Sequence, residues 1–339
     1  MAVALCVGID YYKHANPLHQ CCIDARSVAQ VLNRNGDGTK NFNDIVCALA
    51  EDEETALTRA ELRAAVEKLF STQTDTVLFY FSGHGAVDAY GGYLCTSEVD
   101  NVDDGLSMDV LMQIVERSPA LNKIIILDSC HSGQLGNSNS WGAMSGFCKL
   151  PDNTTILAAC GGKGVSYEGV FTPLLVDALA GGAMNLLGEV TPGGIYSYID
   201  RSMGDWFQRP VFKANVKNFI CLRKCKAPID IQKLHQIVDF FPSEYSLYQL
   251  DPTYEEDKRP IDAEKKVVLD EKDWPEDAPV PEVNKEHEAI MKIFRKYHQL
   301  NLLVPVEEEY MYWAARLSDC VKLTAQGRFY WKLVNENRI

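Results

Sequence analysis

Two apolar runs in this sequence each end on a side chain that can take part in nucleophilic catalysis. One is "TVLFYFSGHG", in which His84 stands between two glycines, and the other is "KIIILDSCHSG", which carries Cys130. A thiol is a weak nucleophile at its ordinary pKa of about 8.5, and a nearby imidazole can convert it to the thiolate. If the two runs are neighbouring strands, both residues emerge at one edge of a sheet. The pattern therefore predicts a catalytic pair of Cys130 and His84.

The glycines around His84 fit both a catalytic and a purely structural interpretation. Glycine lets the backbone turn sharply and lets a substrate chain come close. The N–H groups of Gly85 and Cys130 are accordingly predicted to form an oxyanion hole. On the structural interpretation, Cys130 is a small buried hydrophobe and His84 caps a loop. The occurrence of both residues after two strand-like runs favours catalysis.

The two runs belong to an alternation of short apolar stretches and amphipathic stretches over the first two thirds of the chain. Such an order predicts an α/β fold with a mostly parallel six-stranded sheet and helices on both faces. In these sheets sites form beyond the carboxyl ends of the strands. Thr58 and Glu61 predict a capping box at the start of the second helix. The predicted strands are residues 3–9, 44–49, 76–81, 123–127, 155–159 and 216–222, and the predicted helices are residues 24–33, 58–70, 107–117 and 171–180.

Composition and charge limit the classes of function. The chain has 339 residues, 46% of them hydrophobic and 24% charged, which is typical of a folded globular protein. No apolar run approaches the ~18 residues that cross a bilayer, and the start "MAVALCVGIDYYKH" lacks the basic flank of a signal peptide. Eleven scattered cysteines indicate reduced thiols. We therefore expect a cytoplasmic protein without membrane contact, and the net charge of −14 argues against a nucleic-acid partner.

Five stretches of the sequence together resemble the caspase-like cysteine peptidases, in the branch of the metacaspases and bacterial orthocaspases. They are "VALCVGIDYY", "CCIDARSV", "FYFSGHG", "IILDSCHSG" and "QRPVFKAN". The separation of His84 and Cys130, 46 residues (130 − 84), is similar to the caspase separation of about 50. The resemblance implies a peptidase domain over residues 1–223 that cleaves protein substrates with these two residues. True caspases carry Gln and Ala before the nucleophile, whereas Asp128 and Ser129 stand there in this chain.

The resemblance to metacaspases also implies the specificity pocket. In that family an aspartate two residues before the nucleophile and another in the "DA" after the first strand line the pocket, which correspond here to Asp128 and Asp24. Two carboxylates in a partly desolvated pocket repel each other unless a cation lies between them, so Arg or Lys is the expected occupant. Asp24 could instead be a helix N-cap, and the two roles are compatible.

Calcium is a possible cofactor, although the peptidase chemistry itself requires none. The segment "SEVDNVDDGLSMD" offers carboxylates that suit calcium, and many metacaspases need the ion. Acidic loops are also commonly just solvated, so both interpretations stay open. The candidate ligands are Asp100, Asp103, Asp104 and Asp109.

The last third of the chain has a different character. Residues 224–282 are predicted to be an acidic, proline-containing linker, because residues 251–282 hold twelve acidic and five basic side chains and five prolines. Residues 283–339 predict a small helical module whose order, ending in a helix that starts at Thr324, is similar to a winged helix. We expect this module to bind a regulatory protein partner rather than DNA.

Basic residues in two segments are predicted processing sites for an enzyme that cleaves after Lys or Arg. Residues 134–153 are rich in Gly, Ser and Asn, follow the nucleophile and contain Lys149 as their only basic residue. Such loops open easily and are preferred cleavage sites. Cleavage in the acidic segment would sever the module, at the pairs Lys258 with Arg259 and Lys265 with Lys266. The alternative is that these side chains are ordinary solvated charges.

The sequence thus predicts a regulated cysteine endopeptidase that cleaves after Arg or Lys. By likeness of architecture we expect it to act in a bacterial stress or defence pathway. The alternative is a catalytically silent scaffold on a peptidase fold, for which an altered His84 or Cys130 would be the sequence mark. Both residues are present.

Overall fold

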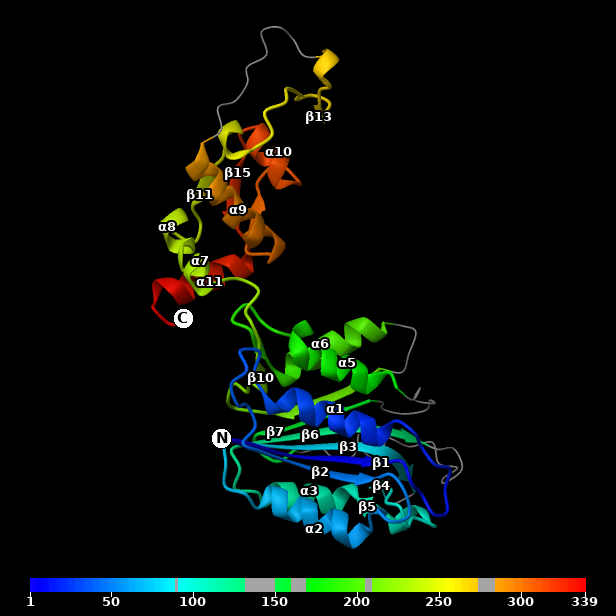
Figure 1. Ribbon diagram of the computed structural model, residues 1–339. Coiled ribbons are helices and arrows are strands. Elements are labelled where there is room, and N and C mark those ends of the chain that lie inside the picture. Colours follow the sequence, from blue (N-terminus) through cyan, green and yellow to red (C-terminus); the bar gives the residue numbers. More distant parts are fainter. Residues whose placement is uncertain (89–90, 132–149, 160–168, 205–208, 274–283) are drawn as a thin grey trace. The chain divides into compact units, whose positions relative to one another are not determined.

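The computed structural model describes residues 1–88, 91–131, 150–159, 169–204, 209–273 and 284–339 (Figure 1). At Cys130 and His131 it describes the backbone. The chain forms two compact units, Met1–Ala227 and Pro228–Ile339. Each unit has its own buried side chains.

The first unit is built on a mostly parallel sheet, as the sequence predicts. Its main path runs in the order β2, β1, β3, β6, β7, β9, and the first five of these strands are parallel neighbours. Two short strands extend the sheet from the end of β3. The bounds are β1 Ala2–Ile9, β2 Asp44–Ala50, β3 Thr76–Val87, β4 Gly92–Leu94, β5 Leu106–Ser107, β6 Asn122–His131, β7 Thr154–Ala158 and β9 Val211–Asn215.

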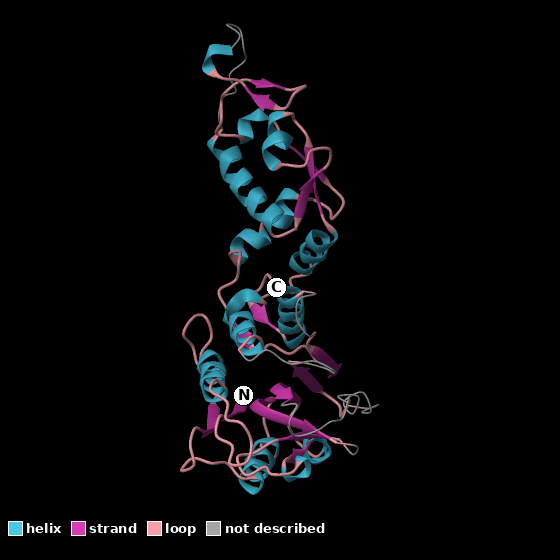
Figure 2. Ribbon diagram, turned by 90° about the vertical axis from the view of Figure 1, so that its right-hand side faces the viewer, coloured by secondary structure: helices cyan, strands magenta, loops and turns pink. Residues whose placement is uncertain are grey.

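Helices cover both faces of this sheet (Figures 1 and 2). On one face α1, α5 and α6 bury the apolar side chains of a core that includes Val28, Leu175 and Ile199. On the other face α2 and α3 bury Leu62 and Leu111. The helices are α1 Cys21–Asn33, α2 Arg59–Phe70, α3 Met108–Glu116, α5 Phe171–Asp177 and α6 Pro192–Met203. Shorter elements are η1 Val102–Asp104, η2 Ala178–Gly182, β8 Glu189–Val190 and β10 Arg223–Lys224.

The starts of α1 and α2 test the expected caps. The predicted capping box at α2 is confirmed, since Thr58 accepts from the backbone of Glu61 and the Glu61 side chain accepts from the backbone of Thr58. Asp24, however, is not an N-cap, because α1 begins three residues earlier. The carboxylate of Asp10 instead accepts the backbone N–H groups of Cys21 and Cys22, at 2.8 and 3.3 Å.

The prediction of the last strand of the sheet was wrong. β9 lies at Val211–Asn215 and pairs antiparallel with β7, whereas residues 216–222 form no strand. The apolar residues of this segment serve the core in another way. Ile220 and Leu222 are buried in the core beneath α1, α5 and α6, while Phe219 is 65% exposed.

The second unit packs helices on a three-stranded antiparallel sheet in the order β11, β15, β14. Several elements of this unit lie before residue 283, within the segment predicted to be a linker. Their apolar side chains Leu234, Ile237 and Phe241 are buried. Thr324 is the N-cap of the last helix, as predicted, and the winged-helix likeness stays a prediction. The bounds are α7 Ile231–His235, α8 Ile237–Phe240, β11 Leu247–Gln249, η3 Pro252–Tyr254, β12 Ile261–Asp262, β13 Val267–Val268, η4 Glu271–Asp273, α9 Lys285–Gln299, β14 Leu303–Pro305, α10 Met311–Arg316, β15 Cys320–Leu323 and α11 Ala325–Asn335.

Candidate active site

The backbones of His84 and Cys130 lie side by side at the carboxyl edge of the sheet. β3 and β6 are parallel neighbours, and their register pairs His84 with Cys130 and Ser82 with Asp128. Neighbouring strands are about 4.8 Å apart. The two residues that the sequence analysis joined by chemistry are therefore adjacent strand positions, although they are 46 residues (130 − 84) apart in the chain.

The imidazole of His84 is buried, with 3% of the residue exposed, and the segment after β1 holds it. Its Nε2 lies 2.8 Å from the carbonyl oxygen of Asn16. A carbonyl oxygen can only accept a hydrogen bond, so Nε2 carries a proton in this contact. In the neutral ring Nδ1 is then the basic nitrogen. This tautomer is the one that a general base acting through Nδ1 needs.

Tyr12 fixes the same residue from a second direction. Its hydroxyl accepts the backbone N–H of His84 at 2.8 Å, and the two ring centroids are 4.5 Å apart. Burial raises the pKa of the Tyr12 phenol well above its ordinary value, so the hydroxyl keeps its proton. Gly83 permits this approach, because a Cβ atom there would lie 2.6 Å from the Tyr12 oxygen. Sequence reasoning missed Tyr12, which "IDYY" gave no cause to single out.

The two aspartates of the predicted pocket are both buried near the end of β3. Asp24 is 5% exposed and Asp128 is 8% exposed. Burial raises the pKa of the Tyr80 phenol, and the negative charges of Asp128 and Asp24 raise it further. Both carboxylates thus act electrostatically on this one side chain, and their role in a substrate pocket stays a prediction.

Cys21 and Ser82 lie within the same acidic region and were missed by the sequence analysis. Burial raises the pKa of the Cys21 thiol; a hydrogen bond with Ser82 lowers it, and the charges of Asp128 and Asp24 raise it. The missed signal was periodicity, because Ser82 stands two positions before His84 on one strand. A neutral thiol and a hydroxyl thus accompany the two carboxylates.

The backbone at Gly85, the predicted partner of Cys130 in an oxyanion hole, is part of the sheet. Gly85 is paired with His131 of β6 on one side and with Leu94 of β4 on the other. The role of the Gly85 and Cys130 N–H groups stays a prediction.

The structure does not gather the proposed calcium ligands into one group. The carboxylate of Asp104 accepts the backbone N–H groups of Asn101 and Asp100, at 2.7 and 3.2 Å, and these bonds lower its pKa. Asp109 lies in the first turn of α3. Within the described ranges, no cluster of three or more His, Cys, Asp or Glu side chains could hold a metal ion. Calcium binding through Asp100, Asp103, Asp104 and Asp109 stays an untested prediction.

The predicted processing sites differ in how firmly their backbone is held. Lys149 lies outside the described residues. The buried guanidinium of Arg316 donates to the carbonyl oxygens of Asp257 and Arg259, which fixes the chain at the pair Lys258 and Arg259. The second pair follows β12 in a hairpin, where Lys265 contacts Asp262 at 2.9 Å and Lys266 contacts Glu308 at 2.6 Å. Both of these lysines are exposed.

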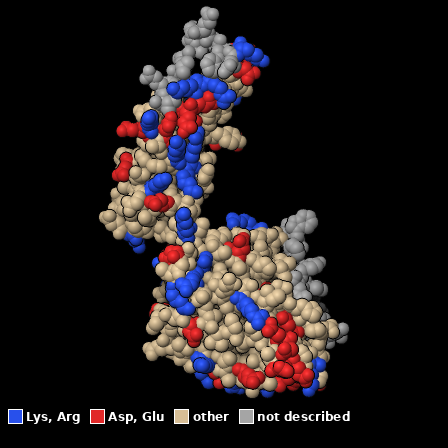
Figure 3. Space-filling view, viewed as in Figure 1, with Lys and Arg blue, Asp and Glu red and all other residues tan. Residues whose placement is uncertain are grey.

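Acidic side chains gather on one side of the first unit, near the carboxyl edge of the sheet (Figure 3). Glu51, Asp52, Glu53 and Glu54 follow β2 and are all exposed, as are Glu98 and Asp100 after β4. Two hydrogen bonds join the chain beside these loops: the Ser97 N–H donates to the Leu57 carbonyl oxygen, and the Leu57 N–H donates to the Ser97 hydroxyl, both at 3.0 Å. We call the residues of these two loops, 51–54 and 98–100, the acidic rim. A cluster of exposed carboxylates creates a negative potential that attracts cations.

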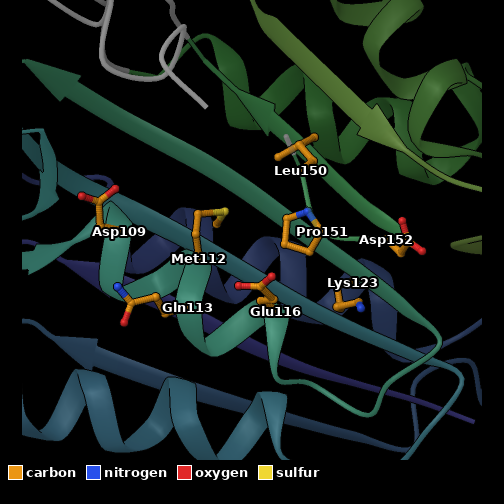
Figure 4. Close-up of a pocket in the computed structure, with 8 residues that line it drawn as sticks. All are labelled: Asp109, Met112, Gln113, Glu116, Lys123, Leu150, Pro151 and Asp152. Atoms are coloured by element: carbon orange, nitrogen blue, oxygen red, sulfur yellow. The ribbon is translucent and has the colours of Figure 1, made fainter. Parts of the chain in front are cut away.

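A separate pocket of about 550 Å³ lies between α3 and the segment that leads into β7 (Figure 4). Lys123, at the start of β6, lines one side of it, and Asp109, in the first turn of α3, lines the other (Figure 4). His84, Asp24 and Asp128 are not among the residues that line it. Its lining residues are Asp109, Met112, Gln113, Glu116, Lys123, Leu150, Pro151 and Asp152.

No helix among the described residues is both long enough and apolar enough to cross a bilayer.

The fold and the two strand-end residues define the class: an α/β protein with a histidine and a cysteine paired at the carboxyl edge of a mostly parallel sheet. A family model described as the caspase domain matches residues 1–197. The chain belongs to this caspase family.

Two metacaspases are similar in sequence to the chain. Metacaspase-1 of Botryotinia fuckeliana (strain B05.10) is 25% identical over 202 residues, which are 55% of this chain and 46% of that protein. Metacaspase-1 of Sclerotinia sclerotiorum (strain ATCC 18683 / 1980 / Ss-1) is also 25% identical over 202 residues, 55% of this chain and 44% of that protein. The match thus spans less than half the length of these relatives.

Two solved structures are similar in fold. The crystal structure of caspase-1 from Spodoptera frugiperda is 13% identical, with a TM-score of 0.46 over 67% of this chain and 90% of that chain. The structure of pro-sf-caspase-1 is 12% identical, with a TM-score of 0.44 over 65% of this chain and 93% of that one.

Proposed function

We propose that this protein is a cysteine endopeptidase that cleaves protein substrates after Arg or Lys. The observation that carries the proposal is the register of β3 and β6. In this register His84 is paired with Cys130, and two residues earlier on each strand Ser82 is paired with the buried Asp128. A nucleophile, a base and a buried negative charge thus share one edge of the sheet.

The chemistry follows from the hydrogen bond that His84 makes. With the Nε2 proton held by the carbonyl of Asn16, Nδ1 takes the proton of the Cys130 thiol. The thiolate attacks the substrate carbonyl carbon, and the N–H groups of Gly85 and Cys130 stabilise the oxyanion of the tetrahedral intermediate. The imidazolium then donates its proton to the leaving amine as the peptide bond breaks. Water hydrolyses the thioester and releases the acid, which restores the thiol.

The preference for a cation follows from the burial of Asp24 and Asp128. Two carboxylates buried in one region repel each other. The guanidinium of Arg or the ammonium of Lys offsets this repulsion and supplies several hydrogen-bond donors. An Asp side chain at the same place would add a third negative charge.

The proposal also includes regulation of the enzyme by cleavage of its own chain at exposed basic residues. We propose that the exposed pair Lys265 and Lys266, more readily than the pair Lys258 and Arg259, is open to cleavage, because Arg316 holds the backbone of the latter. A regulatory partner that binds residues 283–339, a requirement for calcium and a bacterial stress or defence setting stay predictions.

Fluorogenic peptides ending in Arg, Lys or Asp test the proposal with the purified full chain. We expect turnover of the Arg and Lys peptides and none of the Asp peptide. Assays in calcium and in a chelator show whether the ion is needed. If no peptide is cleaved in either buffer, while the protein is folded and its thiols are reduced, the scaffold alternative is favoured.

A further inference from the structure

We propose that Thr172, supported by Tyr80, is a specificity-positioning residue that holds the carboxylate of Asp128 ionised and correctly oriented for a cationic substrate side chain. This inference rests on the proposed function, because it assigns a further part of the same substrate pocket. Thr172 lies outside the sequence motifs around Cys130 and His84, and Tyr80, although it is part of "FYFSGHG", was given no role there.

The three side chains form a buried chain of hydrogen bonds. The hydroxyl of Thr172 donates to Oδ2 of Asp128 at 2.6 Å, and the hydroxyl of Tyr80 lies 2.6 Å from the same Thr172 oxygen. Thr172 is 1% exposed and Tyr80 is fully buried. Water therefore does not compete for these bonds, and each hydroxyl depends on its protein neighbours.

The chemistry of the groups decides the direction of the chain. A threonine hydroxyl has one hydrogen, and an ionised carboxylate can only accept. The Thr172 hydrogen is therefore used on Asp128, so the Tyr80 hydroxyl must donate to the Thr172 oxygen. Burial, followed by the charges of Asp128 and Asp24, raises the pKa of Tyr80 well above its ordinary value, so this donor keeps its proton. The Tyr80 hydroxyl thus donates to Thr172, and the Thr172 hydroxyl donates to Asp128.

A hydrogen bond donated to a carboxylate favours its charged form. That effect matters here because Asp24 is buried in the same region and disfavours a second negative charge. A carboxylate can accept about four hydrogen bonds, so the bond from Thr172 is compatible with simultaneous binding of a guanidinium or ammonium group. The fixed Oδ2 sets the plane of the carboxylate that this group meets.

The scaffold keeps the Thr172 hydroxyl in place. Thr172 is the second residue of α5, and its neighbours Phe171 and Leu175 are both buried in the core on that face of the sheet. His84, in contrast, is held by Tyr12 and Asn16 from the segment after β1. Loss of the Thr172 hydroxyl should therefore change substrate binding far more than the chemistry of the thiol.

Three variants test this inference: Thr172→Val, which keeps the shape and removes the hydroxyl, Thr172→Ser, which keeps the hydroxyl, and Tyr80→Phe. For Thr172→Val we expect kcat/KM for Arg and Lys peptides to fall about tenfold, mainly through KM, since a bond to a charged group is lost. The acidic limb of its pH profile should move to higher pH, because Asp128 becomes easier to protonate. Thr172→Ser should retain most activity, and Tyr80→Phe should lose about threefold.

A second measurement separates this inference from the proposed function. The rate at which iodoacetamide, a small neutral reagent, alkylates Cys130 should be the same in Thr172→Val and in the wild type. An inactive wild type would refute the proposed function. An active wild type whose Thr172→Val variant has an unchanged KM and pH profile would refute the role of Thr172 alone. If Thr172→Val does not fold, the other two variants decide. Unchanged kinetics in Tyr80→Phe would refute the role of Thr172. A greater loss of kcat/KM in Thr172→Ser than in Tyr80→Phe would refute it as well.

Discussion

His84 and Asp128 lie at the ends of neighbouring strands, yet different parts of the chain hold them. The segment after β1 holds His84, through the hydroxyl of Tyr12 and the carbonyl of Asn16. Helix α5, some 90 residues farther along the chain than His84, holds Asp128 through Thr172 (172 − 84 = 88). On the proposed function, the site thus has a chemical half around His84 and a specificity half around Asp128, which share a sheet but have separate supports.

This division implies that substitutions in the two halves affect kinetics in different ways. Changes around His84 should lower kcat, because they misplace the base, and changes around Asp128 should act mainly on the binding of cationic substrates.

The largest effect is expected for the catalytic pair itself. Cys130→Ala and His84→Ala should each lower kcat for an Arg peptide by at least about a thousandfold, because nucleophile and base act as one unit. Cys47→Ala, which removes an exposed thiol of β2, is the matched control and should be fully active. Substantial turnover by folded Cys130→Ala would remove the chemical half of the account.

The next largest effect is expected at Asp128. Asp128→Asn should cost about 2 to 5 kcal/mol in transition-state binding of Arg and Lys peptides, as for other buried charge pairs. Asp44→Asn, at an exposed position in β2, controls for the general loss of one negative charge. Equal activity of the two variants on Arg peptides would contradict the assignment of the pocket.

Tyr12→Phe probes the support of the chemical half. The variant removes the oxygen that accepts the His84 N–H, so we expect kcat to fall about tenfold while KM is unchanged. Tyr11→Phe, one residue earlier and only partly buried, is the control. A change confined to KM would mean that Tyr12 belongs to the specificity half instead.

The smallest effect concerns the acidic rim. Raising the ionic strength from about 0.05 to 0.5 M should lower kcat/KM for basic peptides several-fold, because salt screens exposed charges. The double variant Glu53→Gln, Glu54→Gln should show lower activity at low salt and a weaker dependence on salt. A kcat/KM that is insensitive to salt in the wild type would show that the rim does not steer substrates.

Features with a local cause could be predicted from the sequence. The strands β1, β2, β3, β6 and β7 are apolar runs, and their alternation with amphipathic helices predicts a mostly parallel sheet. The capping box of Thr58 and Glu61 lies within one turn of helix. The placement of His84 beside Cys130 followed from the same logic, because two buried parallel strands bring their carboxyl ends to one edge.

Features that depend on distant partners could not be predicted in this way. The cap of α1 comes from Asp10, eleven residues before the N–H of Cys21 that it accepts. The contact of Tyr80 with Thr172 spans 92 residues. The apolar residues of segment 216–222 fit a strand as well as a core-packing loop, and only the pairing of β9 with β7 decides between them. Periodicity reports which residues are buried, but it does not report which element covers them.

Covalent labelling tests the central claim, the joint action of the two halves, most directly. The probes are a matched pair of acyloxymethyl ketone peptides, one ending in Arg and one in Asp, and peptide mass spectrometry locates the adduct. We expect the Arg probe to modify Cys130 in the wild type, slowly in Asp128→Asn and not in His84→Ala. The Asp probe should leave Cys130 unmodified. Modification of another cysteine by the Arg probe, or equal labelling of Cys130 by both probes, would contradict the account.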